Sequence, residues 1–367
     1  MQPRSLLVIN SGSSTIKFAL FRYQPEPALL RRGTADRHDH GPALPALLDA
    51  IAAHTDQFPL AAIGHRVVHG GPSHHQPVVV TEGLVEELRR LVPLAPNHLP
   101  DSIALIDECR RLRPATAQMV CFDTAFYAAL PAQARRLPIP KTFDERGVRR
   151  YGFHGLAFTY LLDELRRLAP DEADARLILA HLGNGSSLTA VTGGRPIDTT
   201  MGFTPIGGIV MSTRTGDIDP GVVTHLMRET RATADDLERL LSRESGLLAI
   251  SGHSGDVREL LAREPEDADS RLAVTIFCYE TRKRIGAFAA ALEGLDGLVF
   301  SGGIGEHASS IRERICAGLE FVGVAIDRER NAANAPVIST DDSRVRVRVI
   351  AANEELVIAR DAYRLLH

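Results

Sequence analysis

The sequence predicts an α/β protein built from two duplicated domains, on three observations. A Gly-Ser-Ser motif follows an apolar run at Gly12–Ser14 and again at Gly185–Ser187, and an apolar segment resumes after each copy. Apolar runs of strand length alternate with helical patterns along the chain. The length of 367 residues exceeds what one hydrophobic core usually serves. Because glycine permits close backbone approach and serine supplies donors, the two motifs predict loops that hold a polyphosphate from both sides.

The amino-acid composition limits the classes of protein to which the chain can belong. The chain is 44% hydrophobic and 24% charged, as is ordinary for a globular protein. Its formal net charge of -4 provides no basic field, so we expect no nucleic-acid partner. The four cysteines lack metal-ligand or disulfide spacing and are expected to be buried thiols. The start of the chain lacks the features of a signal peptide and no apolar run could cross a bilayer, so we expect a cytoplasmic protein without membrane contact.

The N-terminal half begins with a predicted hairpin of half-buried strands at Leu6–Asn10 and Ile16–Phe21. The proline-rich segment 23–59, with a helical pattern at Leu44–His54, is expected to cover the sheet. Further strands and helices are then expected. The strands are Ile63–His69 and Met119–Phe122, and the helices are Val85–Leu91 and Pro100–Arg111, the second with a cap at Pro100-Asp101-Ser102.

A loop leading into a helix at Tyr151–Arg167 precedes the second Gly-Ser-Ser unit and marks the expected boundary between the halves. Gly302–Gly305 stands between a predicted strand and a predicted helix, a position typical of anion cradles, although a simple tight turn fits equally well. The other expected elements are the strands Gly297–Ser301 and Arg344–Ile350 and the helices Pro220–Arg231, Asp235–Arg243, Asp269–Leu292, Ser309–Leu319 and Asn353–Leu366.

Polar residues follow several apolar runs, where the ends of strands expose side chains to a crevice. Arg66 lies in a strand-like run flanked by glycines, and its position favours an internal salt bridge over a clamp on an anionic ligand. Asp123 directly follows a buried run, where a helix cap is the common role and a catalytic carboxylate the rarer one.

Two more polar positions have both a structural and a functional interpretation. His154 stands between glycines, which fits either a structural histidine or one exposed in a cleft. Asp217 and Asp219 are candidate caps for the helix that starts at Pro220, which leaves Arg214 available for another contact.

Eight motifs occur in order along the chain. They are Val8-Ile-Asn10-x-Gly-Ser-Ser, Gly64-His-Arg-Val-Val-His-Gly-Gly71, Phe122-Asp-Thr-Ala-Phe126, Tyr151-Gly-Phe-His-Gly155, His181-Leu-Gly-Asn-Gly185, Thr213-Arg-Thr-Gly-Asp-Ile-Asp-Pro220, Ser301-Gly-Gly-Ile-Gly-Glu306 and Asn353-Glu-Glu355. In this order, and over nearly the whole chain, they resemble the acetate kinase family.

The resemblance implies the fold of actin-like ATPases and of acetate and sugar kinases, in which two duplicated ribonuclease-H-like domains close on ATP across a cleft. Domain I would comprise residues 1–122 plus 353–367, with the N-terminal phosphate loop and a carboxylate-binding arginine. Domain II would comprise residues 123–352, with the second phosphate loop and the adenosine loop. Members of the family form homodimers, so the resemblance implies a homodimer here.

The resemblance also implies an activity, the reversible ATP-dependent phosphorylation of acetate to acetyl phosphate by direct in-line transfer. ATP or ADP would be the co-substrate and Mg²⁺ the metal, with Mn²⁺ as an alternative ion. A propionate or other short-chain acyl kinase is the nearest alternative. An actin-like, nucleotide-gated binding module without acyl kinase activity is another, but it gives Arg66, His154 and Arg214 no obvious role.

The family's site residues carry over to matching positions. Asn10 and Glu354 would lie near Mg²⁺, through waters, and Arg66 would hold the substrate carboxylate. Asp123 would take the family's essential acidic position, where orienting Arg66 is preferred over proton abstraction because acetate is already ionised. His154 and Arg214 would meet the transferring phosphoryl group, and Val68, Phe153 and Pro205 would surround the acyl methyl group. Nucleotide contacts are implied for Lys17, His181, Leu182, Gly183, Asn184, Gly185, Asp256, Val257, Arg258, Gly303, Ile304, Gly305, Glu306 and His307.

The chain departs from the family pattern in four places. Pro93–His98 lacks the family's His-Asn-Pro, and Leu156–Phe158 replaces Thr-Ser-His. His307 stands where the family has asparagine, and the chain is shortened around residues 24–62. These changes bear on acyl specificity, nucleotide preference and efficiency more than on the type of reaction.

Overall fold

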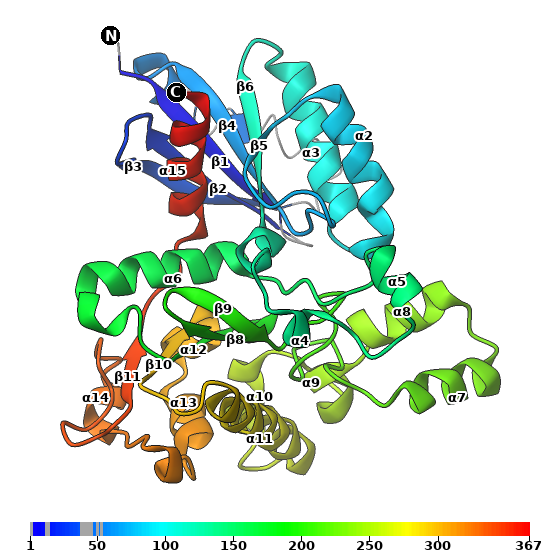
Figure 1. The fold of residues 1–367 in the computed structure, drawn as a ribbon, viewed down its shortest axis with the longest axis vertical. Coiled ribbons are helices and arrows are strands. Elements are labelled where there is room, and N and C mark those ends of the chain that lie inside the picture. The colour runs from blue at the N-terminus through cyan, green and yellow to red at the C-terminus, as the bar shows by residue number, and fades with distance from the viewer. Residues whose placement is uncertain (1–2, 12–14, 37–46, 49–50, 52–53) are drawn as a thin grey trace. The chain divides into compact units, whose positions relative to one another are not determined.

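The computed structural model describes residues 3–11, 15–36, 47–48, 51 and 54–367 (Figure 1). Backbone contacts divide the chain into two compact units. Unit 1 consists of Met1–Ala128, Phe153–Tyr160 and Asn353–His367, and unit 2 of Ala129–Gly152 and Leu161–Ala352. The expected domains, 1–122 plus 353–367 and 123–352, stay a prediction, and these units differ from them by placing residues 123–128 and Phe153–Tyr160 in unit 1.

A six-stranded mixed sheet forms the centre of unit 1, with strand order β3-β2-β1-β4-β6-β5. Its first three strands are antiparallel neighbours, which confirms the predicted hairpin, whereas β4 and β6 run parallel to β1. The strands are β1 (Ser5–Ser11), β2 (Thr15–Arg22), β3 (Leu29–Asp36), β4 (Leu60–Val67), β5 (Val78–Val79) and β6 (Ala117–Phe122).

Helices cover both faces of this sheet, because alternate residues of a strand point to opposite sides. On β4, Ala62 packs in one cluster with Ile358 of α15 (Glu354–Leu366), whereas the next residue, Ile63, packs with Leu105 of α3 (Leu99–Leu112). The helix α2 (Glu82–Leu91) lies beside α3, with Leu84 in a shared core (Figure 1).

Unit 2 contains a five-stranded mixed sheet with strand order β11-β10-β7-β8-β9. The long helix α11 (Ala268–Ala291) packs on it, with Phe277 and Phe288 in one core with Ile178 and Phe300 of the sheet. The strands are β7 (Leu177–Leu182), β8 (Ser186–Thr192), β9 (Arg195–Thr199), β10 (Gly297–Ser301) and β11 (Arg346–Val349). No helix among the described residues has the length and apolar character to cross a membrane.

The remaining helices of unit 2 are mostly short. They are α4 (Ala132–Arg135), α5 (Lys141–Glu145), α7 (Pro220–Thr230), α8 (Ala234–Arg243), α9 (Gly246–Ser251), α10 (Val257–Arg263), α12 (Gly302–His307), α13 (Ser309–Cys316) and α14 (Arg328–Ala332). The helix α6 (Gly155–Leu168) begins in unit 1, and the division between the units falls within it.

Both sheets follow the same plan. In unit 1, the antiparallel strands β1-β2-β3 are consecutive in the sequence, and the parallel strands β4 and β6 extend the sheet beyond β1. In unit 2, β7-β8-β9 are arranged in the same way, and the parallel strands β10 and β11 extend the sheet beyond β7. The prediction of an α/β protein with duplicated domains is therefore confirmed at the level of strand order.

Three local predictions are wrong, and a fourth lies mostly outside the described residues. The segment expected only to cover the sheet contributes the edge strand β3, whose side chains at 29–34 are mostly exposed and lack a clear apolar alternation. The helix α3 begins at Leu99, so Asp101 and Ser102 do not cap it. Gly302–His307 is a short helix rather than a loop. Most of the helical pattern at Leu44–His54 lies outside the described residues.

One buried polar pair lies on the α3 side of the unit 1 sheet. His65 on β4 is 2% exposed, and its Nε2 is 2.9 Å from Oε1 of Gln118 on β6. Burial lowers the pKa of His65 from 6.5 to about 4, although the contact with Gln118 raises it. The folded protein therefore holds this histidine neutral at pH values where an unfolded chain protonates it.

We expect the free energy of unfolding to fall as the pH decreases from 6.5 to 4, because the unfolded state binds a proton that folded His65 excludes. The contribution is about 3 kcal/mol over this window. Urea unfolding followed by circular dichroism at several pH values should show a flatter dependence in His65→Gln. His75→Gln, at an exposed position before β5, is the matched control. An unchanged slope in His65→Gln would contradict the burial of this imidazole.

Candidate functional site

Arg66 and Asp123 form an ion pair at the edge of the unit 1 sheet. Because β1, β4 and β6 run parallel, their carboxyl ends meet at one edge. Arg66 donates from Nε to Asp123 Oδ1 at 3.0 Å and from Nη2 to Oδ2 at 2.6 Å. The Asp123 side chain is 1% exposed. The internal salt bridge favoured from the sequence is therefore present, and it uses the planar fork of the guanidinium.

Asn10 and Glu354 contact the other side of the same guanidinium. Nη1 of Arg66 is 3.1 Å from Asn10 Oδ1 and 3.2 Å from Glu354 Oε2. Asn10 also donates from Nδ2 to Glu354 Oε2 at 3.2 Å. Asn10 lies near the end of β1 and Glu354 begins α15, so this cluster joins residues from opposite ends of the chain.

Two buried carboxyl groups in this cluster share one guanidinium. Burial raises the pKa of Glu354, Arg66 lowers it, and Asp123 raises it again, so that the pKa lies above its usual value. Burial alone would lower the pKa of Arg66, but Asp123 and Glu354 raise it above the ordinary arginine value. The cluster therefore has a surplus of acidic groups, which suits an additional cation.

The donor atoms of Asn10 and Glu354 fit the hard cation Mg²⁺, which prefers oxygen ligands and keeps several waters. In the described part of the chain, no three His, Cys, Asp or Glu residues are grouped to hold a metal ion. With Asn10 and Glu354 as its only named protein ligands, an ion at this cluster would keep several of its water molecules.

The segment Phe153–Gly155 packs against the turn that carries Asp123. A Cβ atom on Gly155 would lie 2.0 Å from the Asp123 carbonyl oxygen, so a larger residue does not fit there. The Tyr127 hydroxyl donates to the Phe153 carbonyl at 3.0 Å. His154, with φ of 59°, adopts the left-handed conformation directly before α6. These contacts hold the backbone of His154 beside the Arg66 cluster.

The predicted acyl-pocket residues are divided between the units. In unit 1, Val68 and Phe153 are buried, and the Phe153 ring packs edge to face on His69 with centroids 5.5 Å apart. Pro205 belongs to unit 2.

Lys17, a predicted nucleotide contact, is exposed on β2, opposite Asn10 in the strand register. The predicted phosphate loop Gly12–Ser14 lies outside the described residues.

In unit 2, the two glycine segments meet at the carboxyl ends of β7 and β10. These strands are parallel neighbours, with His181 opposite Ser301. Gly302 has φ of 77°, and a Cβ atom there would lie 2.6 Å from the Leu182 carbonyl oxygen. A Cβ on Gly183 would lie 3.9 Å from the Gly303 nitrogen. The close contact explains why glycine is required at position 302.

Ser212 connects the second Gly-Ser-Ser turn to the expected adenosine segment. Its nitrogen donates to the Asn184 carbonyl at 3.3 Å, and its hydroxyl donates to the Gly255 carbonyl at 2.8 Å. Asp256 caps α10 by accepting a bond from the Arg258 nitrogen at 2.8 Å, and Val257 is buried in the core. Parts of the predicted nucleotide segments 181–185, 256–258 and 303–307 are thus connected near the carboxyl ends of β7 and β10.

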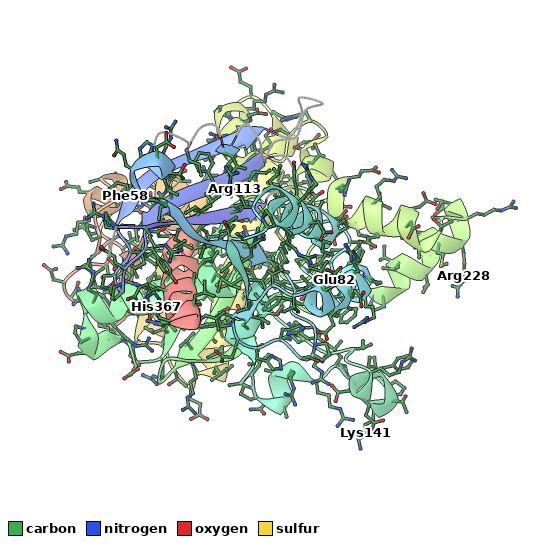
Figure 2. All side chains as sticks on the ribbon, turned by 90° about the horizontal axis from the view of Figure 1, so that it is seen from above. Phe58, Glu82, Arg113, Lys141, Arg228 and His367 are labelled. Atoms are coloured by element: carbon green, nitrogen blue, oxygen red, sulfur yellow. The ribbon has the colours of Figure 1, made fainter. Side chains whose placement is uncertain are left out.

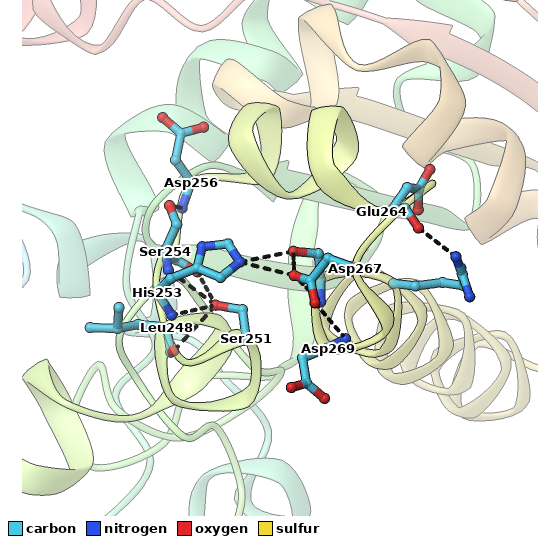
Figure 3. Close-up of polar contacts among 10 residues, drawn as sticks. Leu248, Ser251, His253, Ser254, Asp256, Glu264, Asp267 and Asp269 are labelled. Atoms are coloured by element: carbon cyan, nitrogen blue, oxygen red, sulfur yellow. Dashed lines mark hydrogen bonds and ion pairs between the residues drawn. The ribbon is translucent and has the colours of Figure 1, made fainter.

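The loop before α10 is fastened to the start of α11 (Figure 3). His253 Nε2 is 3.0 Å from Asp267 Oδ2, and the Ser251 hydroxyl donates to the Ser254 carbonyl at 2.7 Å. Hydrogen bonds from Ser270 and His253 hold the pKa of Asp267 well below its usual range. These contacts hold the part of the loop that directly precedes Asp256.

Arg214 and Pro205 are neighbours in unit 2, since Arg214 Nη1 donates to the Pro205 carbonyl at 3.1 Å. Asp219 caps α7 as predicted, by accepting from the Gly221 nitrogen at 2.7 Å. Asp217 does not cap this helix. It accepts instead from the Gly208 nitrogen at 2.8 Å and pairs with Arg284, because the turn folds back over the preceding glycines.

Glu306 has a structural contact that the sequence did not suggest. Its Oε1 accepts from the Gly302 nitrogen at 2.8 Å and from the Ala352 nitrogen at 3.0 Å. These bonds close the turn of α12, which explains why a glycine-rich segment is helical here. Ser212 was also missed, although it stands in a conspicuous polar run, and nothing in the sequence distinguishes the buried Arg312 of α13 from a surface arginine.

Comparisons with known proteins agree over the full length of the chain. The Acetokinase family matches residues 30–360. Acetate kinase of Rhodopseudomonas palustris is 42% identical over 391 aligned positions, covering 98% of each chain. Acetate kinase of Streptomyces avermitilis is 40% identical over 401 positions, covering 100% of this chain and 98% of the relative.

Solved structures give the same result and confirm the predicted α/β fold class. Porphyromonas gingivalis acetate kinase has a TM-score of 0.88 and 32% identity, covering 99% of this chain and all (100%) of that one. A propionate kinase from Francisella tularensis also has a TM-score of 0.88, with 33% identity and 98% coverage of both chains. On the evidence of the matching family, relatives and structures, the chain belongs to the Acetokinase family.

Proposed function

We propose that this protein is an acetate kinase, which transfers the terminal phosphoryl group of ATP to acetate and forms acetyl phosphate and ADP reversibly. The observation that carries the proposal is the buried cluster of Arg66, Asp123, Asn10 and Glu354 at the sheet edge of unit 1, in a chain 42% identical to a curated acetate kinase.

Arg66 would bind the acetate carboxylate, and Asp123 would orient Arg66. The two parallel bonds between them support this division of roles, because they fix the plane of the guanidinium. Acetate is already ionised near neutral pH, so the reaction needs its oxygen positioned rather than deprotonated. Val68, Phe153 and Pro205 would surround the methyl group.

His154 and Arg214 would face the phosphoryl group during transfer. In a loose phosphoryl-transfer transition state the charge spreads over three equatorial oxygens, so fixed cations and donors account for most of the rate enhancement. The backbone contacts of Phe153–Gly155 and the bond from Arg214 to Pro205 support fixed positions for both residues within their units.

ATP would be held by segments of unit 2 and by Lys17 of unit 1. The proposed contacts in unit 2 are His181–Gly185, Asp256–Arg258 and Gly303–His307. Asn10 and Glu354 would hold Mg²⁺, or Mn²⁺ in its place, through water. The ion supplies charge neutralisation for the phosphate oxygens. We further propose a cytoplasmic location, as expected from the sequence.

A propionate kinase is a second candidate, because the propionate kinase from Francisella tularensis matches the chain with a TM-score of 0.88. One added methylene changes affinity for an apolar pocket by only about 1–3 kcal/mol. The choice between these substrates would therefore depend on the apolar side chains proposed to surround the acyl group.

A hydroxylamine trap for acyl phosphates, run with ATP, Mg²⁺ and either formate, acetate, propionate or butyrate, tests the proposed activity. We expect acetate to give the highest kcat/KM and propionate to be used more slowly. A higher value for propionate would establish the second candidate. ATP binding without any acyl hydroxamate would instead favour a nucleotide-gated binding module.

Loss of the two parallel hydrogen bonds between Arg66 and Asp123 should specifically lower kcat/KM for acetate. For Arg66→Lys we expect kcat/KM for acetate to fall on the order of 10²–10³, as for removal of one preorganised donor at a reacting oxygen. Arg176→Lys is a matched control, because Arg176 also forms two bonds with an aspartate, Asp296, at 2.9 and 2.6 Å. Equal effects of the two substitutions on acetate kinetics would contradict the role of Arg66.

We also propose a homodimer in which α7 contributes to the interface. None of the residues of α7 is buried, and Val222 and Met227 are 40% and 47% exposed. Figure 2 shows Arg228 of this helix extending outward. Exposed apolar side chains of this kind can mark a surface that a partner covers.

Light scattering should show a dimer for the wild type and a monomer for Val222→Asp combined with Met227→Asp, because two buried charges would oppose association. Phe321→Asp is the control, since Phe321 is 74% exposed and lies outside α7. A dimer that survives the double substitution would exclude α7 from the interface.

A further inference from the structure

Arg312 of α13 is fully buried, with 0% of its surface exposed. No carboxylate of the described residues forms an ion pair with it, and its bonds go to carbonyl and amide oxygens. Burial without a counter-ion disfavours the charged form and lowers the pKa of Arg312. An apolar side chain would avoid this cost, so the arginine needs an explanation other than filling space.

The guanidinium has five N–H donors, and each matches one contact. Nε donates to Asn331 Oδ1 at 2.9 Å, and Nη1 donates to the carbonyls of Gly305 and Glu306 at 2.9 and 3.0 Å. Nη2 donates to the Asn331 carbonyl at 2.8 Å and to Asn334 Oδ1 at 2.7 Å. The arrangement is therefore specific to arginine, since lysine has three donors and no fork.

The residues around Arg312 are themselves arranged to accept these bonds. Asn331 is 2% exposed, and its Nδ2 donates to the Ser309 carbonyl at 2.9 Å. Asn334 has a φ of 51°, a left-handed conformation that asparagine tolerates better than most residues. The hydrogen bonds of Arg312 thus connect the turn between α12 and α13 to the end of α14.

The contacts continue from Arg312 to the proposed nucleotide site. Arg312 holds the carbonyls of Gly305 and Glu306, which lie in the last turn of α12, where a cation is favourable. The Glu306 carboxylate holds the Gly302 nitrogen, and Gly302 packs on the backbone of Leu182. One buried guanidinium therefore fixes the whole segment between β10 and α13.

We propose that Arg312 is a positioning residue for ATP, which keeps Gly303–His307 in the conformation that receives the nucleotide. The inference rests on the proposed function, which assigns these residues to the nucleotide. Arg312 itself touches no substrate in this proposal. Its loss should therefore weaken ATP binding and leave the acetate subsite of unit 1 unaffected.

The test compares Arg312→Lys with the wild type in two measurements, steady-state kinetics for both substrates and calorimetric binding of ATP with Mg²⁺ in the absence of acetate. Losing one or two hydrogen bonds from a charged donor should weaken ATP binding about 10- to 100-fold. KM for acetate should stay unchanged. Arg282→Met is the matched control, because Arg282 also bonds backbone carbonyls, those of Arg314 and Ile315 at the far end of α13, and should leave ATP binding unchanged.

Two further variants separate positioning from general loss of structure. Asn334→Gly keeps the left-handed backbone and removes a single acceptor, so it should weaken ATP binding less than Arg312→Lys and leave the melting temperature close to that of the wild type. In Arg312→Ala, low concentrations of guanidinium should restore ATP binding, whereas urea, which is planar but uncharged, should restore less.

Parallel losses in ATP and acetate kinetics, or unchanged ATP binding in both Arg312→Lys and Asn334→Gly, would overturn the proposal. A different result would contradict the proposed acetate kinase activity. A wild type that binds ATP and forms no acyl hydroxamate would contradict acetate kinase activity, while calorimetry on the same variants would still decide the role of Arg312.

Discussion

The ion pair between Arg66 and Asp123 is the contact on which the rest of the unit 1 site depends. It joins the ends of two parallel strands at a nearly buried position, where loss of one partner would leave an uncompensated charge and cost about 3–5 kcal/mol. Asn10, Glu354 and the segment before α6 are then arranged around this pair. The geometry follows from topology, since parallel strands bring their carboxyl ends to one edge.

The two units share one strand order but carry different chemical groups at the carboxyl ends of their strands. In unit 1, the carboxyl edge of the sheet carries an arginine and two carboxyl groups, which suits a small anion and a hydrated cation. In unit 2, the corresponding edge carries backbone turns rich in glycine, which offer N–H groups rather than charged side chains. The proposed carboxylate and nucleotide subsites would therefore use one strand order with different groups at its edge.

Much of this organisation is encoded locally and could be predicted. The apolar runs and the repeated Gly-Ser-Ser motifs located the central strands, and the position of Arg66 in a strand-like run flanked by glycines favoured its salt bridge. The edge strand β3 was missed because an edge needs little apolar alternation. Arg312 was missed for a different reason. Burial of this arginine depends on acceptors from two other segments, 305–306 and 331–334, and local sequence does not reveal such an arrangement.

Glu354 and Asn10 are in contact although 344 positions separate them in the chain, and this has a consequence for synthesis on the ribosome. Until α15 has emerged, one face of the first sheet, including Ala62 and Met119, lacks the helix that covers it. The nascent N-terminal region must therefore keep a large apolar surface exposed while the whole of unit 2 is translated. Chaperone binding during this interval, and early folding of unit 2 before unit 1 is complete, are the natural outcome of this chain order.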